Sequence, residues 1–234
     1  MEAALNTRHR PIRSFVLRQG RITAAQGRII ESTLPALRIP VEQPWQDPWK
    51  GQRAITLEIG FGNGEHLAAL AAAHPEQGFI GAEVHTPGVG SLLLQMENAG
   101  IRNIRIVHDD VVAWMKTLPD ALFQRIIIQF PDPWPKTRQQ KRRLIQPEFA
   151  GMLCRLLKAG GELQLATDWT DYAKHMLKVL NQTQGLQNTH PENGFSDRPG
   201  NRIPTRFERR GEKLGHSVYD MVYRRGDGQL HTNP

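Results

Sequence analysis

The sequence predicts an α/β fold with a doubly wound, mostly parallel sheet. Three observations support this prediction. From residue 54 onward, short apolar segments alternate with longer segments of helical character. The first apolar segment runs directly into a turn with glycines at 60, 62 and 64. Residues 125–130 are almost continuously apolar, which is typical of a parallel strand buried on both faces.

The parallel strands are predicted as short apolar segments that end at or near glycine, acidic or proline residues. In chain order, these five strands are 54–60, 78–83, 104–107, 125–130 and 162–167. A last stretch, 217–223, alternates between apolar and polar residues. It predicts a C-terminal antiparallel edge strand.

The connecting helices are predicted from helical periodicity and from signals at their ends. Thr86 and Pro87 are typical of an N-cap and a first helical position. Gly160 and Gly161 are expected to end the helix that precedes them. The predicted helices are 64–73, 86–99, 111–117, 146–158 and 169–183.

The N-terminal 53 residues differ from the rest of the chain. They show no sustained hydrophobic period and contain five prolines, at 11, 35, 40, 44 and 48. We therefore predict an irregular, basic, partly mobile arm and linker over residues 1–53, with residues 1–30 mobile when no partner is bound. The α/β domain is expected to cover residues 54–234.

Length and composition place the chain in a broad class. With 234 residues, it suits one domain with a sizeable core. No run of roughly 18 apolar residues predicts a membrane span, and residues 1–18 contain no stretch typical of a secretory signal. The single cysteine, Cys154, cannot form an internal disulfide, which suits a reducing compartment. We expect a cytoplasmic protein.

Charge is distributed unevenly along the chain, whose formal net charge is +7. Residues 1–53 carry nine basic and four acidic residues, and residues 131–160 carry seven basic and two acidic residues. Residues 54–130, between them, carry four basic and eight acidic residues. Basic surfaces attract nucleic acid, whereas an acidic region suits a cationic or hydroxyl-rich small molecule. Solvated surface charge is the simpler alternative.

The glycine turn narrows the choice of ligand. Its spacing is G-x-G-x-G over 60–64, whereas a dinucleotide fingerprint needs G-x-G-x-x-G and a P-loop needs Gly-Lys-Ser/Thr. Acidic residues lie at or near the ends of the first three strands: Glu58, Glu83, and Asp109 or Asp110. These acids would repel a pyrophosphate, but they suit S-adenosylmethionine, which carries an ammonium and a sulfonium and has no phosphate. The pattern resembles the Rossmann-like class I methyltransferases that use S-adenosylmethionine.

The segment after the fourth strand carries a second chemical signal. Asp132 lies between Pro131 and Pro133, which restrict the backbone and favour a rigidly held carboxylate. A basic stretch follows at 137–143, with four basic residues in seven. Beside a catalytic centre, such a stretch indicates a phosphate-binding surface, although it is also typical of a solvated loop.

Several motifs together resemble the bacterial tRNA (guanine-N7)-methyltransferases. The most specific is FPDPWPK at 130–136, followed by KRR at 141–143. The other matching segments are LEIGFG at 57–62, EVH at 83–85 with PGVG at 87–90, ATDW at 166–169, TRFERRG at 205–211 with LGH at 214–216, and SFV at 14–16. The resemblance covers roughly residues 12–224, in the same order as in that family.

The resemblance implies roles for the matched positions. The residues implied in binding S-adenosylmethionine are Glu58, Gly60, Gly62, Glu83, Asp110 and Asp132, and Asp132 is also implied as the catalytic residue. Counting from Gly100 and Asn103 favours Asp110 over Asp109. The positions implied in substrate binding are Lys136, Asp168, Thr205, Arg206, Phe207 and Glu208. Those implied in RNA binding are Arg138, Lys141, Arg142 and Arg143.

The implied reaction agrees with these residue types. N7 of guanine has a lone pair and faces the major groove, so it can attack the sulfonium methyl group without losing a proton. A strong general base is therefore not needed. Fixed carboxylates such as Asp132 and Asp168 would stabilise the positive charge that the purine gains. By resemblance, the target is guanine 46 in the tRNA variable loop.

Two alternative functions stay open at this point. A methyltransferase that acts on an exocyclic amine typically has an Asp/Asn-Pro-Pro-aromatic motif, whereas this chain has a single proline after Asp132. A non-catalytic RNA-binding protein on the same fold would gain nothing from the acidic set. The nine histidines show no ligand spacing such as H-E-x-x-H, so we expect no metal. The expected partner is tRNA, with no membrane, and the protein is a monomer or a homodimer.

Overall fold

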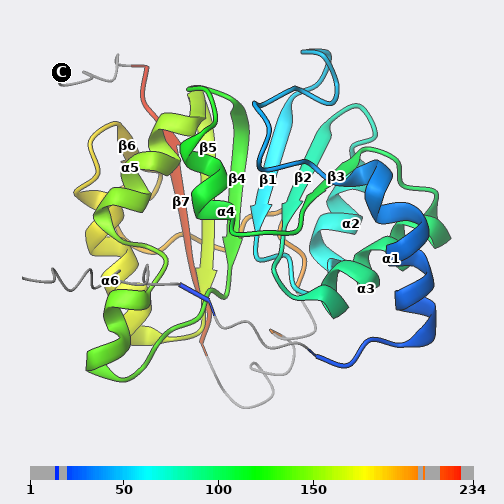
Figure 1. Cartoon of the computed structure of the whole chain (residues 1–234). Coiled ribbons are helices and arrows are strands. Elements are labelled where there is room, and N and C mark those ends of the chain that lie inside the picture. The colour runs from blue at the N-terminus through cyan, green and yellow to red at the C-terminus, as the bar shows by residue number, and fades with distance from the viewer. Residues whose placement is uncertain (1–13, 16–19, 205–207, 209–216, 228–234) are drawn as a thin grey trace, which may run out of the picture.

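The computed structural model describes residues 14–15, 20–204, 208 and 217–227. Within these residues a seven-stranded sheet has the strand order β3-β2-β1-β4-β5-β7-β6. Figure 1 shows the parallel strands pointing the same way, so that their carboxyl ends meet at one edge. In chain order, the strands are β1 (Ile55–Ile59), β2 (Gly78–Ala82), β3 (Ile104–Val107), β4 (Phe123–Gln129), β5 (Leu157–Thr167), β6 (Leu186–Asn188) and β7 (Tyr219–Arg225).

Six α-helices and one short 3₁₀ helix surround this sheet in the described part of the chain. In Figure 1, α4, α5 and α6 gather toward β5 and β7, and α1, α2 and α3 toward β2 and β3. The helices are α1 (Ala24–Leu37), α2 (Glu65–Ala73), α3 (Thr86–Ala99), α4 (Val111–Lys116), η1 (Thr137–Arg142), α5 (Pro147–Leu156) and α6 (Thr170–Asn181). The predicted α/β fold with a mostly parallel sheet is therefore confirmed.

The core consists of two apolar layers, one on each face of the sheet. Alternation along β1 divides its side chains between them. Leu57 and Ile59 pack in the layer that α4, α5 and α6 cover. The opposite layer holds Phe61 and Leu67 together with apolar residues of α1 and α3. The nearly continuous apolar run of β4 supplies both layers, with Ile126 and Ile128 on one face and Ile127 on the other, so the expected burial on both faces is confirmed.

The order of the strands reverses between β1 and β4. From β1 the chain continues outward through β2 to β3, and then returns to place β4 on the other side of β1. All four of these strands are parallel to their neighbours. Ligands of doubly wound sheets bind at such a switch point, outside the carboxyl ends of the strands. The fold thus predicts where the site lies.

The prediction that residues 1–53 are irregular was wrong for α1. Thr23 begins this helix with a capping box, because its hydroxyl accepts from the Gln26 amide while the Gln26 side chain accepts from the Thr23 amide. Ile29 and Leu34 bury their side chains in the same apolar layer as α3. After the helix, the Ile39 amide donates to the Ile106 carbonyl at 2.8 Å. The chain at Ile39 thus partly covers the open edge of β3.

The predicted antiparallel edge of the sheet is confirmed, and it contains two strands. β7 pairs antiparallel with β5, with Leu165 opposite Met221. The short strand β6, which was not predicted, pairs with the other side of β7 and lies outermost. Its three residues are too few for a recognisable period.

The junction of α5 and β5 also differs from the prediction. The helix ends at Leu156 and the strand begins at Leu157, so Gly160 and Gly161 lie inside the strand instead of ending a helix. Gly160 has φ of +69°, and the register with β4 shifts between Phe123 and Arg125. An irregularity of this kind needs a glycine because it places the backbone in the left-handed region.

No described helix combines the length and the apolar character that a membrane span requires.

Candidate active site

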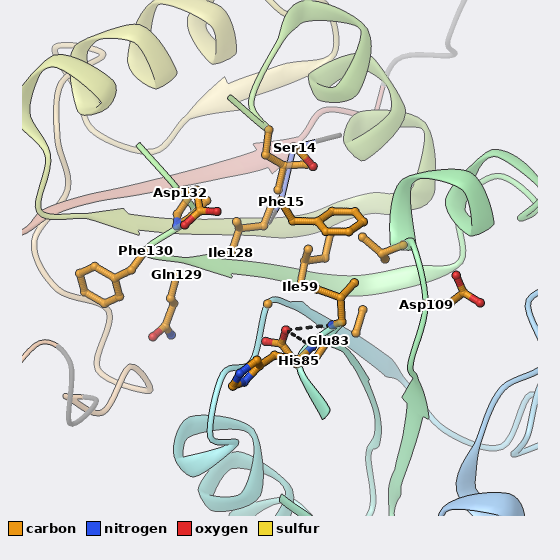
Figure 2. Close-up of a pocket in the computed structure, with 16 residues that line it drawn as sticks. Ser14, Phe15, Ile59, Glu83, His85, Asp109, Ile128, Gln129, Phe130 and Asp132 are labelled. Atoms are coloured by element: carbon orange, nitrogen blue, oxygen red, sulfur yellow. Dashed lines mark hydrogen bonds between the residues drawn. The ribbon is translucent and has the colours of Figure 1, made fainter. Parts of the chain in front are cut away.

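A pocket of about 440 Å³ opens at the carboxyl edge of the sheet, where the strand order reverses. Its walls come from the ends of four strands: Ile59 and Gly60 after β1, Glu83 after β2, Asp109 after β3 and Ile128 to Asp132 at the end of β4. This volume falls in the range of small-molecule sites. Figure 2 shows Asp132 in the upper part of the view and Glu83 in the lower part, with Phe15 to the right of Asp132.

The glycine turn adopts a conformation that only glycine adopts easily. Gly60, Gly62 and Gly64 have φ values of +73°, +57° and +81°. The start of α3 lies so close to this turn that a Cβ atom on Gly88 would collide with the carbonyl oxygen of Gly62. The turn therefore leaves the backbone of Gly60 open to the pocket.

Glu83 is held in place by three backbone amides. Its Oε2 accepts from the Gly62 amide at 2.9 Å, and its Oε1 accepts from the Val84 and His85 amides at 2.8 and 3.0 Å. Figure 2 marks the hydrogen bonds to this carboxylate among the residues drawn. A carboxylate has about four acceptor positions, so Glu83 keeps capacity for one ligand hydroxyl group. Its hydrogen bonds also tie β2 to the glycine turn.

Glu58 is placed differently from the other acids of the predicted set. Its side chain is 3% exposed and points to the face of the sheet that α2 covers. Its Oε2 lies 2.9 Å from Nδ1 of the buried His66. Glu58 does not line the pocket, although it lies two residues before Gly60, which does.

The two adjacent aspartates after β3 have separate positions. Asp109 lines the pocket, and its Oδ1 accepts from the Asp110 amide at 2.7 Å. Asp110 is the N-cap of α4 and accepts from the Val112 amide at 3.0 Å. Asp110 does not line the pocket. Of the two, the structure thus brings Asp109 together with Glu83 and Asp132.

The segment around Asp132 has an unusual backbone. Phe130 and Trp134, which flank the Pro131-Asp132-Pro133 tripeptide, have φ values of +50° and +44°. Left-handed backbone at a residue with a Cβ costs about 1–2 kcal/mol and persists where the surroundings fix it, often at functional sites. The carboxylate of Asp132 lines the pocket at the end of this segment. The expected rigid presentation of Asp132 therefore has a structural basis.

Two residues from the N-terminal segment complete the pocket. The carbonyl of Ser14 accepts from the Trp134 indole nitrogen at 3.1 Å. The carbonyl of Phe15 accepts from Nη2 of Arg142 at 3.3 Å, and both residues line the pocket. Arg142 also lies over the Trp134 ring, with its Cζ 3.7 Å from the ring centroid. These contacts join the N-terminal segment to the loop that carries Asp132.

The four basic residues predicted to contact RNA fall into two groups. Arg138 and Lys141 are exposed on η1, in positions open to a polyanion. Arg142 is half-buried against Trp134, and Arg143 is only 3% exposed. The basic run is therefore not a uniformly solvated face, and Arg143 does not belong to its exposed part.

The residues predicted to bind the substrate are only partly described. Lys136 is exposed just before η1, and Asp168 follows the end of β5, so both lie near the carboxyl edge beside Asp132. Glu208 is buried and forms hydrogen bonds with Arg198 and Arg202. The other three predicted substrate residues, Thr205, Arg206 and Phe207, lie outside the described residues.

The composition of the pocket indicates its ligand class. Three acidic residues line it, Glu83, Asp109 and Asp132, and the described lining contains no lysine or arginine. Nη2 of Arg38 lies 3.8 Å from Oδ2 of Asp109. This acidic wall repels phosphate groups and suits a cationic ligand with hydroxyl groups. Within the described residues, no group of three or more His, Cys, Asp or Glu side chains is arranged to hold a metal ion.

Comparison with known proteins agrees with the fold. A family model described as "Putative methyltransferase" matches residues 52–221. The 16S rRNA methyltransferase KamB has a similar fold, with a TM-score of 0.53 at 13% identity, over 81% of this chain and 99% of that chain. The methyltransferase Kmr is similar at a TM-score of 0.51 and 15% identity, over 77% of this chain and 91% of that chain. The fold and the site thus define a Rossmann-like methyltransferase.

Two curated relatives give the particular family. A tRNA (guanine-N(7)-)-methyltransferase of Acidithiobacillus ferrooxidans is 69% identical, over 96% of this chain and 99% of the relative. One of Methylococcus capsulatus is 50% identical, over 92% of this chain and 95% of the relative. The chain belongs to the bacterial tRNA (guanine-N7)-methyltransferase family. The family named from the sequence motifs is therefore confirmed.

Proposed function

We propose that this protein transfers a methyl group from S-adenosylmethionine to N7 of a guanine in tRNA, at position 46 of the variable loop. The observation that carries the proposal is the position of Asp132. It lines the same pocket as the glycine turn and Glu83, and the exposed basic residues of η1 follow it within ten residues of the chain. A cofactor pocket and an anion-binding surface thus meet at one carboxylate. The relatives named for this reaction support the choice of substrate.

The residues of the pocket fit S-adenosylmethionine. Glu83 would accept from a ribose hydroxyl, as acids after the second strand do in other nucleoside-binding sheets. Gly60 would let the amino-acid portion approach the backbone closely. The carboxylates of Asp109 and Asp132 would face a ligand with two positive centres. When bound, this cofactor supplies an electrophilic methyl group on its sulfonium.

The protein's own residues then align the reactants and stabilise charge. The lone pair of guanine N7 is available without deprotonation, so no general base has to act. As N7 gains the methyl group, positive charge develops on the purine, and the fixed carboxylate of Asp132 stabilises it. The proline-flanked segment keeps this carboxylate at a constant angle, and alignment of the reacting atoms supplies much of the rate.

A labelling experiment tests the proposed reaction directly. Purified protein, methyl-labelled S-adenosylmethionine and an unmodified tRNA transcript are incubated, and the RNA is digested to nucleosides. We expect label in 7-methylguanosine, and we expect it to disappear when guanine 46 is replaced with adenine. Label in a different nucleoside would contradict N7 methylation and favour the exocyclic-amine alternative. Absence of label together with tight tRNA binding would favour the non-catalytic alternative.

A pair of variants tests which aspartate after β3 contacts the cofactor. We propose Asp109, because it lines the pocket while Asp110 caps α4. Asp109→Asn should weaken S-adenosylmethionine binding about tenfold, since a hydrogen bond to a charged group contributes roughly 1.5–3 kcal/mol. Asp110→Ala should lower the free energy of unfolding by about 1 kcal/mol through the lost cap, with unchanged cofactor affinity. Calorimetric titration and thermal unfolding measure both quantities, and the reverse pattern would assign the contact to Asp110.

The remaining expectations about partners follow from this function. We propose that the protein works in the cytoplasm, where its tRNA substrate is found, as a monomer or a homodimer and without a metal. The exposed side chains of Arg138 and Lys141 are the proposed tRNA contacts on η1. Lys136 and Asp168 are proposed to contact the target nucleotide, together with Thr205, Arg206 and Phe207.

A further inference from the structure

Arg143 is buried in a position where a basic run predicted an exposed side chain. Its Nε donates to the carbonyl oxygen of Pro133 at 2.9 Å. Its Nη2 donates to Oδ2 of Asp171, in the first turn of α6, at 2.5 Å. The guanidinium also lies over the ring of Tyr172, with Cζ 4.9 Å from the ring centroid. One side chain thus connects the loop that carries Asp132 to the start of α6.

The residues after Arg143 are fixed to the same helix. The amide of Ile145 donates to the hydroxyl of Tyr172 at 3.1 Å, and the carbonyl of Ile145 lies 2.8 Å from Nε2 of His175. Tyr172 is fully buried, and burial raises the pKa of its hydroxyl. This hydroxyl therefore stays protonated and neutral at physiological pH. The first two turns of α6 thus form a rigid base against which residues 143–145 pack.

The loop itself needs such an anchor. Pro133 directly follows Asp132, and both neighbours of the tripeptide, Phe130 and Trp134, have left-handed backbone. Proline has no amide hydrogen to hold the loop in place. The hydrogen bond from Arg143 to the Pro133 carbonyl therefore restrains the loop one residue after Asp132.

We propose that Arg143 is a positioning residue: it holds the peptide unit between Pro133 and Trp134 against α6, and through Pro133 it fixes the angle of the Asp132 carboxylate in the pocket. The role in catalysis rests on the proposed function. Arginine is required because its planar group donates from Nε and Nη2 in two fixed directions, whereas lysine has a single flexible ammonium. Arg143 accordingly does not contribute a phosphate contact to tRNA binding.

Three variants test this proposal in the full-length protein. Arg143→Lys keeps the charge but loses the forked geometry, and Arg143→Gln loses both. Lys141→Gln, two residues earlier on the exposed side of η1, is the matched control for a phosphate contact. Each variant is measured for kcat and KM, for the dependence of the tRNA dissociation constant on salt, and for amide hydrogen exchange of residues 130–146. Exchange of residues 55–82 checks that the sheet stays folded.

We expect Arg143→Lys to lower kcat about tenfold to a hundredfold, because displacing a reacting group by about 1 Å can slow a reaction by up to about a hundredfold. We also expect faster exchange at residues 130–146, no change at residues 55–82, and the wild-type salt slope. Lys141→Gln should instead flatten the salt slope by about one. Two results would overturn the proposal. The first is a wild-type kcat for Arg143→Lys. The second is a salt slope that Arg143→Gln flattens by about one while amide hydrogen exchange at residues 130–146 stays unchanged. If the wild-type protein methylates no tRNA, the proposed function fails, while the exchange measurement still decides whether Arg143 holds the loop.

Discussion

We expect Asp132→Asn to lower kcat about a hundredfold or more, with little change in the dissociation constant for tRNA. Asparagine keeps the size of the side chain and removes its negative charge, so the substitution separates charge from packing. Loss of a preorganised group that stabilises transition-state charge typically costs a factor of about 10²–10³ in rate. Steady-state kinetics with a saturating tRNA transcript measures kcat, and filter binding measures affinity for the RNA.

Two further variants make this result specific. Asp132→Glu restores the charge but moves it by one methylene, so partial recovery of kcat over Asp132→Asn would indicate a role for the charge. Asp120→Asn is the matched control, because Asp120 lies before β4, at the end of the strand opposite the pocket, and pairs with Arg155 at 2.6 Å. We expect wild-type kcat for this control. Near-normal turnover by Asp132→Asn would contradict the electrostatic role of Asp132 and leave the segment with a packing role only.

The strands and the position of the site could be predicted because their signals are local. The turn at 60–64 needs glycine at positions with positive φ. Thr86-Pro87 marks the start of α3, but the predicted N-cap was wrong by one residue, because His85 is the N-cap and Thr86 is already helical. Parallel strands share a carboxyl edge, so acids at the ends of neighbouring strands come together. The pocket does contain Glu83 and Asp132.

Elements that depend on tertiary contacts were missed. The stability of α1 comes from burying Ile29 and Leu34 against α3, and this partner lies more than fifty residues later in the chain. The capping pair Thr23 and Gln26 was the one local signal of this helix. Strand β6 forms because β7 offers it an open edge, which its three residues do not reveal.

The direction of a side chain was the least predictable property of the site. Alternation along β1 turns Glu58 toward α2 and away from the pocket, where it meets His66. Of two adjacent aspartates, one caps α4 and the other lines the pocket, and their sequence positions differ by a single residue. Arg143 looks like its exposed neighbours in sequence, and only the packing of α6 buries it.

A second large effect is expected where a buried ionic network holds the chain beside the catalytic edge. Arg202 is 3% exposed, and its Nη1 and Nη2 donate to the two carboxylate oxygens of Glu208 at 2.6 and 2.9 Å. Nη2 also donates to Oδ2 of Asp220 at 2.9 Å. Asp220 lies on β7 opposite Ala166, at the end of β5 that leads to Asp168. Asp220 is 5% exposed, and this burial raises the pKa of its carboxyl group.

Arg202→Met should lower the free energy of unfolding by about 3–5 kcal/mol, because it removes the buried cation that Asp220 and Glu208 share, while Glu208 keeps its contact with Arg198. For a chain of this size, the melting temperature should fall by roughly 2–4 °C per kcal/mol. Arg224→Met is the matched control on β7: Arg224 is largely exposed and lies 3.9 Å from Glu162, so its loss should cost at most about 1 kcal/mol. Thermal and urea unfolding of both variants measure the difference.

The same network connects stability to function, because Glu208 follows the predicted substrate residues 205–207 directly in the chain. At a temperature where Arg202→Met stays folded, we expect KM for tRNA to rise more than the dissociation constant for S-adenosylmethionine. Adding Glu208→Gln and Asp220→Asn to Arg202→Met should recover part of the lost stability, since the buried negative charge that Arg202 balanced is then removed. It should leave KM for tRNA raised, because the chain loses its ionic anchor. If Arg202→Met lowers the free energy of unfolding no more than Arg224→Met does, this account is contradicted. Such a result would mean that water reaches the carboxylates of Glu208 and Asp220.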